Sequence, residues 1–140
     1  MIYWFTGSTD TNIKLFSKKL TEFLQTEKRN WRRDVFYISD SDVASDIHIA
    51  QIISNFIQSK GNDVVVDILP YDRTSLNKFK EHIGFNIVEI HVYNSHKKNK
   101  ENLIEITESN NNSFAMDIYS ENTNQSFTKL IHYLRDIDKL

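Results

Sequence analysis

Strand-like and helix-like segments alternate along the chain. Five stretches are apolar and rich in β-branched or aromatic residues, which is typical of strands buried on both faces of an α/β sheet. These predicted strands are residues 2–6, 35–39, 64–69, 85–93 and about 114–118. A polar, Asn-rich region separates the last two, and there we expect at most a fragment of order around Leu103 and Ile104.

Four segments between and after the strands carry apolar residues at helical spacing. Residues 8–12 cap the first, and Ser45 or Asp46 caps the second. Gly61 and Gly84 end the second and third, the third covering about residues 73–83. The apolar positions are Leu15, Phe16, Leu20, Phe23 and Leu24, then Ile49, Ile52, Ile53, Phe56 and Ile57, then Leu76, Phe79 and Ile83, and finally Phe127, Leu130, Ile131, Leu134 and Ile137.

The alternation predicts one α/β domain over residues 1–140. We expect a mainly parallel sheet of five strands, with residues 2–6 in its centre and helices on both faces. The expected core includes Phe5, Phe16, Leu20, Val65, Ile90 and Leu130. Ligands of such folds bind beyond the carboxyl ends of the strands, where residues 7–12, 40–42 and 67–73 should meet.

Composition narrows the classes of function. The formal charge is 17 − 19 = −2, which disfavours a general nucleic-acid binder. The chain has no cysteine, which excludes disulfides, thiolate catalysis and Cys-ligated zinc. No apolar run approaches the ~20 residues that span a bilayer. The first residues lack a basic segment and a cleavage site, so we expect a cytoplasmic protein without a signal peptide or a membrane partner.

The first strand, loop and helix have the architecture of a Walker A phosphate loop without its residues. In that loop, glycines let backbone N–H groups wrap the phosphates, a Lys reaches their oxygens and a Ser or Thr holds Mg²⁺. Gly7 supplies the first glycine, but Asp10 and Asn12 replace the later ones. Ile13 stands at the Lys position and Lys14 at the Ser/Thr position. The residue types alone predict an ordinary loop that caps the helix after it.

Several segments, in order, resemble adenylylsulfate kinase-like proteins. Residues 1–7 (MIYWFTG) are similar to the strand that leads into the family's Walker A loop, and residues 39–42 (SDSD) are similar to its Asp-Gly-Asp. Residues 60–66, followed by Pro70 and Tyr71, resemble its third strand and Ser-Pro-Tyr segment. Residues 114–118 resemble a late strand of short members, some of them phage-encoded. The order and spacing of these weak motifs over nearly the full chain carry the resemblance.

The resemblance implies a three-layer P-loop kinase-like fold with the sheet order 2-3-1-4-5. In the family, the second Asp of Asp-Gly-Asp lies at the substrate hydroxyl, and Asp42 matches it. The Arg three residues later falls on Ser45, and most of the substrate-binding segment is missing before Asp46. Phosphoryl transfer depends on positioning and charge neutralisation. Loss of the phosphate cradle, the metal hydroxyl and the substrate segment together indicates a fold kept without its chemistry.

Two acidic features have competing interpretations. Asp40 and Asp42 suit a divalent metal, but a polar turn before the next helix is favoured. Asp67 lies in an apolar strand and needs a partner because a buried carboxylate is costly. Arg73 is the expected partner, in either a vestigial active-site pair or a structural one.

Basic and histidine residues favour a plain surface role. Residues 28–33 mix bases with Trp31, and residues 96–100 fall where the family has a mobile loop near the nucleotide. For both we favour a solvated surface over a nucleic-acid or nucleotide contact. The five histidines show no metal-ligand spacing.

We therefore expect a catalytically inactive, adenylylsulfate-kinase-like domain that acts as a protein-binding or assembly module. We assign no catalytic residue, metal or cofactor and expect no ATP binding; the partner is another protein or a further copy of the chain. Scarce Ala and abundant Ile, Asn and Lys suggest an A/T-rich gene, which with the phage-encoded relatives favours a viral origin, in the host cytoplasm or a virion. The degenerate loop positions are Gly7, Asp10, Asn12, Ile13 and Lys14, and the vestigial site candidates are Asp40, Asp42, Asp67 and Arg73.

Two alternatives stay open. One is a functioning small-molecule kinase or nucleotide hydrolase with a rewired phosphate site. In it, Lys14 turns toward the phosphates and Asp40 or Asp42 holds Mg²⁺. The other is a nucleotide-binding regulator that has lost only turnover.

Overall fold

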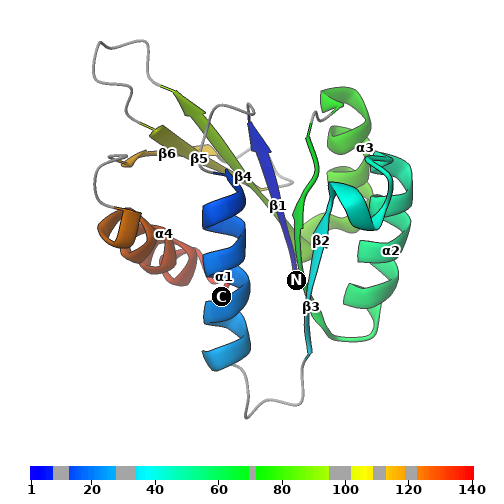
Figure 1. The fold of residues 1–140 in the computed structure, drawn as a ribbon, viewed down its shortest axis with the longest axis horizontal. Helices are drawn as coiled ribbons and strands as arrows, with labels where there is room; N and C mark the ends of the chain where they lie inside the picture. Colours follow the sequence, from blue (N-terminus) through cyan, green and yellow to red (C-terminus); the bar gives the residue numbers. More distant parts are fainter. Residues whose placement is uncertain (8–12, 28–33, 70–71, 95–101, 109–112, 119–122) are drawn as a thin grey trace.

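The fold is a mixed β-sheet with helices on both faces (Figure 1). The computed structural model describes residues 1–7, 13–27, 34–69, 72–94, 102–108, 113–118 and 123–140. The strands are β1 (Ile2–Gly7), β2 (Val35–Ser39), β3 (Asp63–Asp67), β4 (Ile87–Asn94), β5 (Asn102–Glu108) and β6 (Ser113–Ile118). The helices are α1 (Ile13–Glu27), α2 (Ile47–Ser59), α3 (Arg73–Ile83) and α4 (Thr123–Asp136), with short 3₁₀ turns η1 (Asp40–Asp42) and η2 (Gly84–Asn86).

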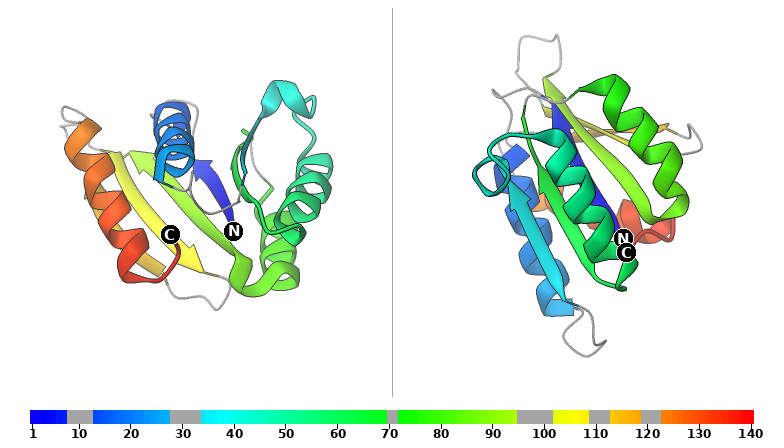
Figure 2. Two further views of the ribbon diagram at one scale, coloured as in Figure 1. Left: turned by 90° about the horizontal axis from the view of Figure 1, so that it is seen from below. Right: turned by 90° about the vertical axis from the view of Figure 1, so that its right-hand side faces the viewer.

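The sheet order is β2-β3-β1-β4-β5-β6. The first four strands are parallel, so the predicted order 2-3-1-4 and the central place of β1 are confirmed. β5 runs antiparallel to β4, and β6 runs antiparallel to β5. The predicted helices on both faces are also confirmed: α1 and α4 cover one face, and α2 and α3 cover the other (Figure 2).

The prediction of five strands is wrong. The Asn-rich region contains the full strand β5, which lies between β4 and the strand predicted to follow it directly. Its sequence, NLIEITE, is short and half polar, so its own apolar content is weak. Antiparallel pairing with its two neighbours in the chain, β4 and β6, satisfies its backbone groups, and the pattern of β5 alone does not reveal this pairing.

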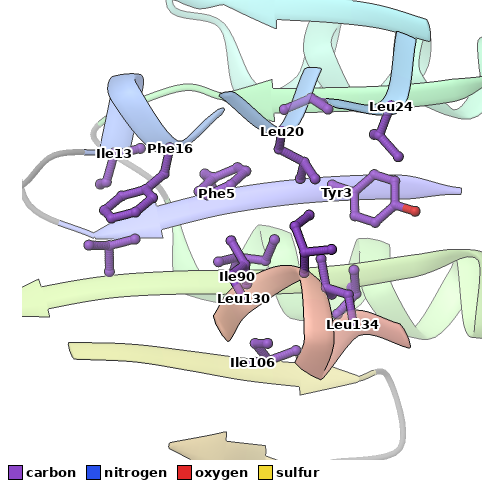
Figure 3. Packing of buried hydrophobic residues seen from close by; sticks show 14 residues of the cluster. Tyr3, Phe5, Ile13, Phe16, Leu20, Leu24, Ile90, Ile106, Leu130 and Leu134 are labelled. Carbon is purple, nitrogen blue, oxygen red and sulfur yellow. The ribbon is translucent and has the colours of Figure 1, made fainter. Parts of the chain in front are cut away.

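Two apolar layers hold the sheet between the helices. Tyr3 and Phe5 of β1 face α1 and α4, together with Ile90 of β4 (Figure 3). Ile2 and Trp4 point to the other face, against residues of α2 and α3. The alternation follows from the two-residue period of a strand. All six predicted core residues are buried, namely Phe5, Phe16, Leu20, Val65, Ile90 and Leu130.

Helix α2 departs from the expected packing. It starts after Asp46, whose carboxylate accepts hydrogen bonds from the N–H groups of His48 and Ile49, as the capping pattern predicts. Its sheet-facing side consists of Ile47, Ala50, Ser54 and Ile57. Four of the five apolar positions that predict this helix are exposed: Ile49, Ile52, Ile53 and Phe56. The apolar residues of this helix therefore occupy two faces, and the sheet covers only one.

Among the helices of the described residues, none combines the length and apolar content that crossing a bilayer requires.

Candidate functional site

The candidate site lies at the carboxyl ends of the parallel strands, at the upper edge of the sheet in Figure 1. Here β1 ends at Gly7, β2 runs into η1, and α1 begins at Ile13. Crossover connections bring these ends together because the strands run in the same direction. Of the predicted loop positions, Asp10 and Asn12 lie outside the described residues, as do residues 28–33 and 96–100, Pro70 and Tyr71.

Gly7 is required by the packing of the two central strands. Its φ is +145°, a conformation that side-chain-bearing residues rarely adopt. A Cβ added there would lie 2.0 Å from the carbonyl oxygen of Val92, the residue of β4 with which Gly7 is in register. The packing of β1 against β4 therefore explains the glycine at position 7 without a bound phosphate.

Ile13 belongs to the apolar core. Its side chain is buried with Phe16 in the layer between α1 and the sheet (Figure 3). In the resemblance to a Walker A loop, this position carries the lysine that reaches phosphate oxygens. The first helical residue thus supplies an anchor for α1 where a phosphate loop supplies a charge.

Lys14 holds two carboxylates together. Its Nζ lies 3.3 Å from Asp40 Oδ2 and 3.3 Å from Asp67 Oδ1. The side chain is 52% exposed, whereas Asp67 is fully buried. Partial burial works to lower the pKa of Lys14, but the charges of Asp67 and Asp40 outweigh it and raise the pKa above its ordinary value. The ammonium is therefore a fixed cation between the acids that end β3 and follow β2.

Asp67 has two further donors. Ser17 Oγ donates to Asp67 Oδ2 at 2.5 Å, and the Tyr37 hydroxyl donates to the same oxygen. Burial and the hydrogen bond to Asp67 raise the pKa of Tyr37 above its ordinary value of 10. Asp67 is thus fully compensated within the protein by one ammonium and two hydroxyls.

Asp40 and Asp42 also have structural roles. Asp40 Oδ1 accepts a hydrogen bond from the Leu69 N–H at 2.8 Å, which ties η1 to the segment that follows β3. Asp42 Oδ2 accepts from the N–H of Ser39 at 2.8 Å and from its hydroxyl at 3.1 Å. These bonds agree with the favoured polar turn, although the cap of α2 is Asp46. Within the described ranges, no three acidic or histidine side chains form a group suited to a metal ion.

A cavity of about 390 Å³ opens beside this cluster. It is lined by Lys14, Lys18, Tyr37, Ser39, Asp40 and Ser41. The lining comes from the first turns of α1, the end of β2 and the start of η1. Two lysines and several hydroxyl groups therefore border the space beside Asp40.

A second charged network, which the sequence pattern does not predict, lies on the opposite face of the sheet. Arg73 donates two hydrogen bonds to Glu89, at 2.6 and 2.7 Å, and Lys80 donates a third at 3.0 Å. The prediction that Asp67 pairs with Arg73 is therefore wrong. Arg73 pairs with Glu89, and Asp67 pairs with Lys14. The available signal was Glu89 itself, a charge inside an apolar strand.

Thr6 completes this second network. Its hydroxyl donates to Glu89 Oε2 at 2.6 Å and lies 2.8 Å from His91 Nδ1. Because the hydroxyl has one proton and gives it to the carboxylate, His91 Nδ1 must donate to the hydroxyl oxygen. Burial works to raise the pKa of Glu89, but Arg73, Thr6 and Lys80 together lower it to about 2. The network is an ionised unit with Glu89, Lys80 and Thr6 buried and Arg73 partly exposed, and it ties α3 to β1 and β4.

Comparison with protein-family models, curated proteins and solved structures finds no match for this chain. The resemblance to adenylylsulfate kinase-like proteins therefore stays a prediction from the residues that carry it.

Proposed function

We propose that this chain is a catalytically inactive, adenylylsulfate-kinase-like domain that serves as a binding or assembly module in a host cytoplasm or a virion. The observation that carries the proposal is the Lys14 ammonium, which lies 3.3 Å from both Asp40 and Asp67. In a P-loop kinase, a hydroxyl at this position and an acid on a neighbouring strand hold Mg²⁺. Here an internal cation neutralises the acids instead.

The positions around Lys14 support the same conclusion. Ile13 is buried in the core, so it offers no charge to a phosphate. A hydrogen bond to a charged group contributes about 1.5–3 kcal/mol, and its loss weakens nucleotide binding accordingly. A divalent cation would also have to displace Lys14 from both carboxylates. In a domain without catalytic activity, the surface that suits a binding partner is the exposed apolar side of α2.

Calorimetric titration with ATP and Mg²⁺ tests the proposal. We expect no heat of binding and no transfer of phosphate to adenylylsulfate from the wild-type protein. The K14A variant should be equally silent, and K19A serves as the control because Lys19 lies on the same helix and contacts Asn124 instead of the acids. Tight ATP–Mg²⁺ binding that K14A abolishes and K19A retains would overturn the proposal.

The cavity beside Lys14 and Lys18 favours one alternative, a nucleotide-binding regulator with a rewired phosphate site. In it, Lys14 leaves the acids and contacts a phosphate directly. Equilibrium dialysis with ATP, ADP and AMP distinguishes the two. Retention of any of these without turnover supports the regulator, and no retention supports the inactive module.

A further inference from the structure

Helix α2 exposes an apolar stripe. Its members are Ile49, Ile52, Ile53 and Phe56, and Ile52 and Phe56 are 71% and 63% exposed. Single exposed apolar residues are common on proteins, but four on consecutive turns of one helix form a contiguous patch. Such a patch marks an interaction surface.

The stripe points to the outside of the molecule. The flank of α2 that carries Gln51 faces α3, because Gln51 Nε2 donates to Ser75 Oγ at 3.0 Å. By helical spacing and exposure, the stripe lies on the side of α2 away from Gln51. The helix itself lies at the outside of the molecule (Figure 2). On the same face of the sheet, the edge strand β2 adds the exposed Phe36.

The charge pattern restricts the partner. Between Ile47 and Ser59, α2 contains no Asp, Glu, Lys or Arg. A copy of this helix brought against itself therefore meets no like-charge repulsion at the centre of the contact. The charges lie at its two ends, with Asp46 before the first turn and Lys60 after the last.

The stripe is also symmetric along the helix. Ile49 and Phe56 lie equally far from the midpoint between Ile52 and Ile53. A two-fold axis through that midpoint pairs Ile49 of one copy with Phe56 of the other and brings the central isoleucines together. It also places Lys60 of one copy near Asp46 of the other and opposes the two helix dipoles.

We propose that the partner of this surface is a second copy of the chain, bound through antiparallel α2 helices about that two-fold axis. The inference rests on the proposed function, since it names the partner of the binding module. The contact is isologous, with the apolar stripe as its centre and the Asp46 and Lys60 ends as its rim.

Introduced cysteines test the register, because the chain has none of its own. I52C lies next to the axis and should form a disulfide-linked dimer under mild oxidation. I49C alone and F56C alone should each stay unlinked. In either variant, the two introduced cysteines of a dimer are about 10 Å apart along the helices. A disulfide needs Cα atoms ~4–7 Å apart, so a mixture of I49C with F56C should cross-link. F85C is the control, since Phe85 is exposed but belongs to η2, where its ring lies 5.7 Å from Lys139 Nζ, and is not part of the stripe.

Sedimentation velocity tests the association itself. The wild-type protein should dimerise with increasing concentration, I52E and I52K should each stay monomeric, and their mixture should dimerise again. F85E should behave as the wild type. A wild-type protein that stays monomeric at every concentration overturns the proposal, as does cross-linking that does not follow the predicted register. Dimerisation that persists in I52E also overturns it and would indicate pairing through the edge strand β2. ATP titration of I52E tests the proposed function independently of the dimer, because this variant is expected to be monomeric.

Discussion

Asp67 and Glu89 are both buried carboxylates of parallel strands, but the protein compensates them differently. Asp67 lies at an open edge and is held by two hydroxyls and the half-exposed Lys14. Glu89 lies under α3 and is held by Arg73, the buried Lys80 and Thr6. The first cluster therefore borders a cavity, whereas the second lies between α3 and the sheet, with only part of Arg73 reaching solvent.

Removal of the Glu89 charge should have the largest effect. In E89Q, Arg73 and Lys80 lose their counter-ion, and Lys80 is left as a charge buried under α3. We expect a loss of about 3–5 kcal/mol in the free energy of unfolding, measured by urea titration. Adding K80M to E89Q should recover part of this loss. A neutral E89Q would show that the network contributes no structural stability.

Acid should weaken the protein through the same residue. The pKa of Glu89 is lowered to about 2 in the folded state from an ordinary value of 4.5. The unfolded chain therefore binds a proton first as the pH falls, and the stabilisation present above about pH 4.5 is lost progressively toward pH 2. Its size is on the order of 3 kcal/mol. Urea titrations between pH 7 and pH 2 should show this loss in the wild type, and a smaller one in E89Q.

Asp67 should tolerate substitution better. D67N keeps an oxygen for the Ser17 and Tyr37 hydroxyls, and Lys14 retains Asp40. We expect a loss of about 1–3 kcal/mol in the same urea titration. The pKa of Tyr37, followed by ultraviolet absorbance in alkali, should fall toward 10 because a neutral amide replaces the charge. A drop in stability as large as that of E89Q would erase the difference between the clusters.

Lys14 should contribute least to stability. Its side chain is half exposed, so solvent screens its ion pairs, and without it the Ser17 and Tyr37 hydroxyls still donate to the buried Asp67; we expect a loss of about 1 kcal/mol or less. K14M should therefore unfold at nearly the same urea concentration as the wild type, with K19M as the matched control. A large loss in K14M would mean that the Lys14 ammonium contributes as much to stability as the Glu89 network does.

The sequence predicts what the pattern within one segment determines and misses what contacts between segments determine. Continuous apolar strands identify the parallel centre of the sheet and its buried residues, including Phe5 and Ile90. The period of α2 does not say which of its two apolar faces meets the sheet. The strand β5 depends on pairing with β4, which its own residues do not reveal. The Glu89 network likewise joins residues of β1, α3 and β4, so Arg73 could not be assigned by proximity in the chain.

The close contact between Gly7 and Val92 explains the first glycine of a Walker A pattern without the phosphate binding that this pattern usually indicates. Any residue with a Cβ at position 7 would force the backbones of β1 and β4 apart. A lineage that gave up nucleotide chemistry would therefore still carry this glycine, since substitution would damage the fold before it affected a ligand. A glycine that ends the first strand of such a protein reports on strand packing, and the residues at positions 13 and 14 carry the information about phosphate.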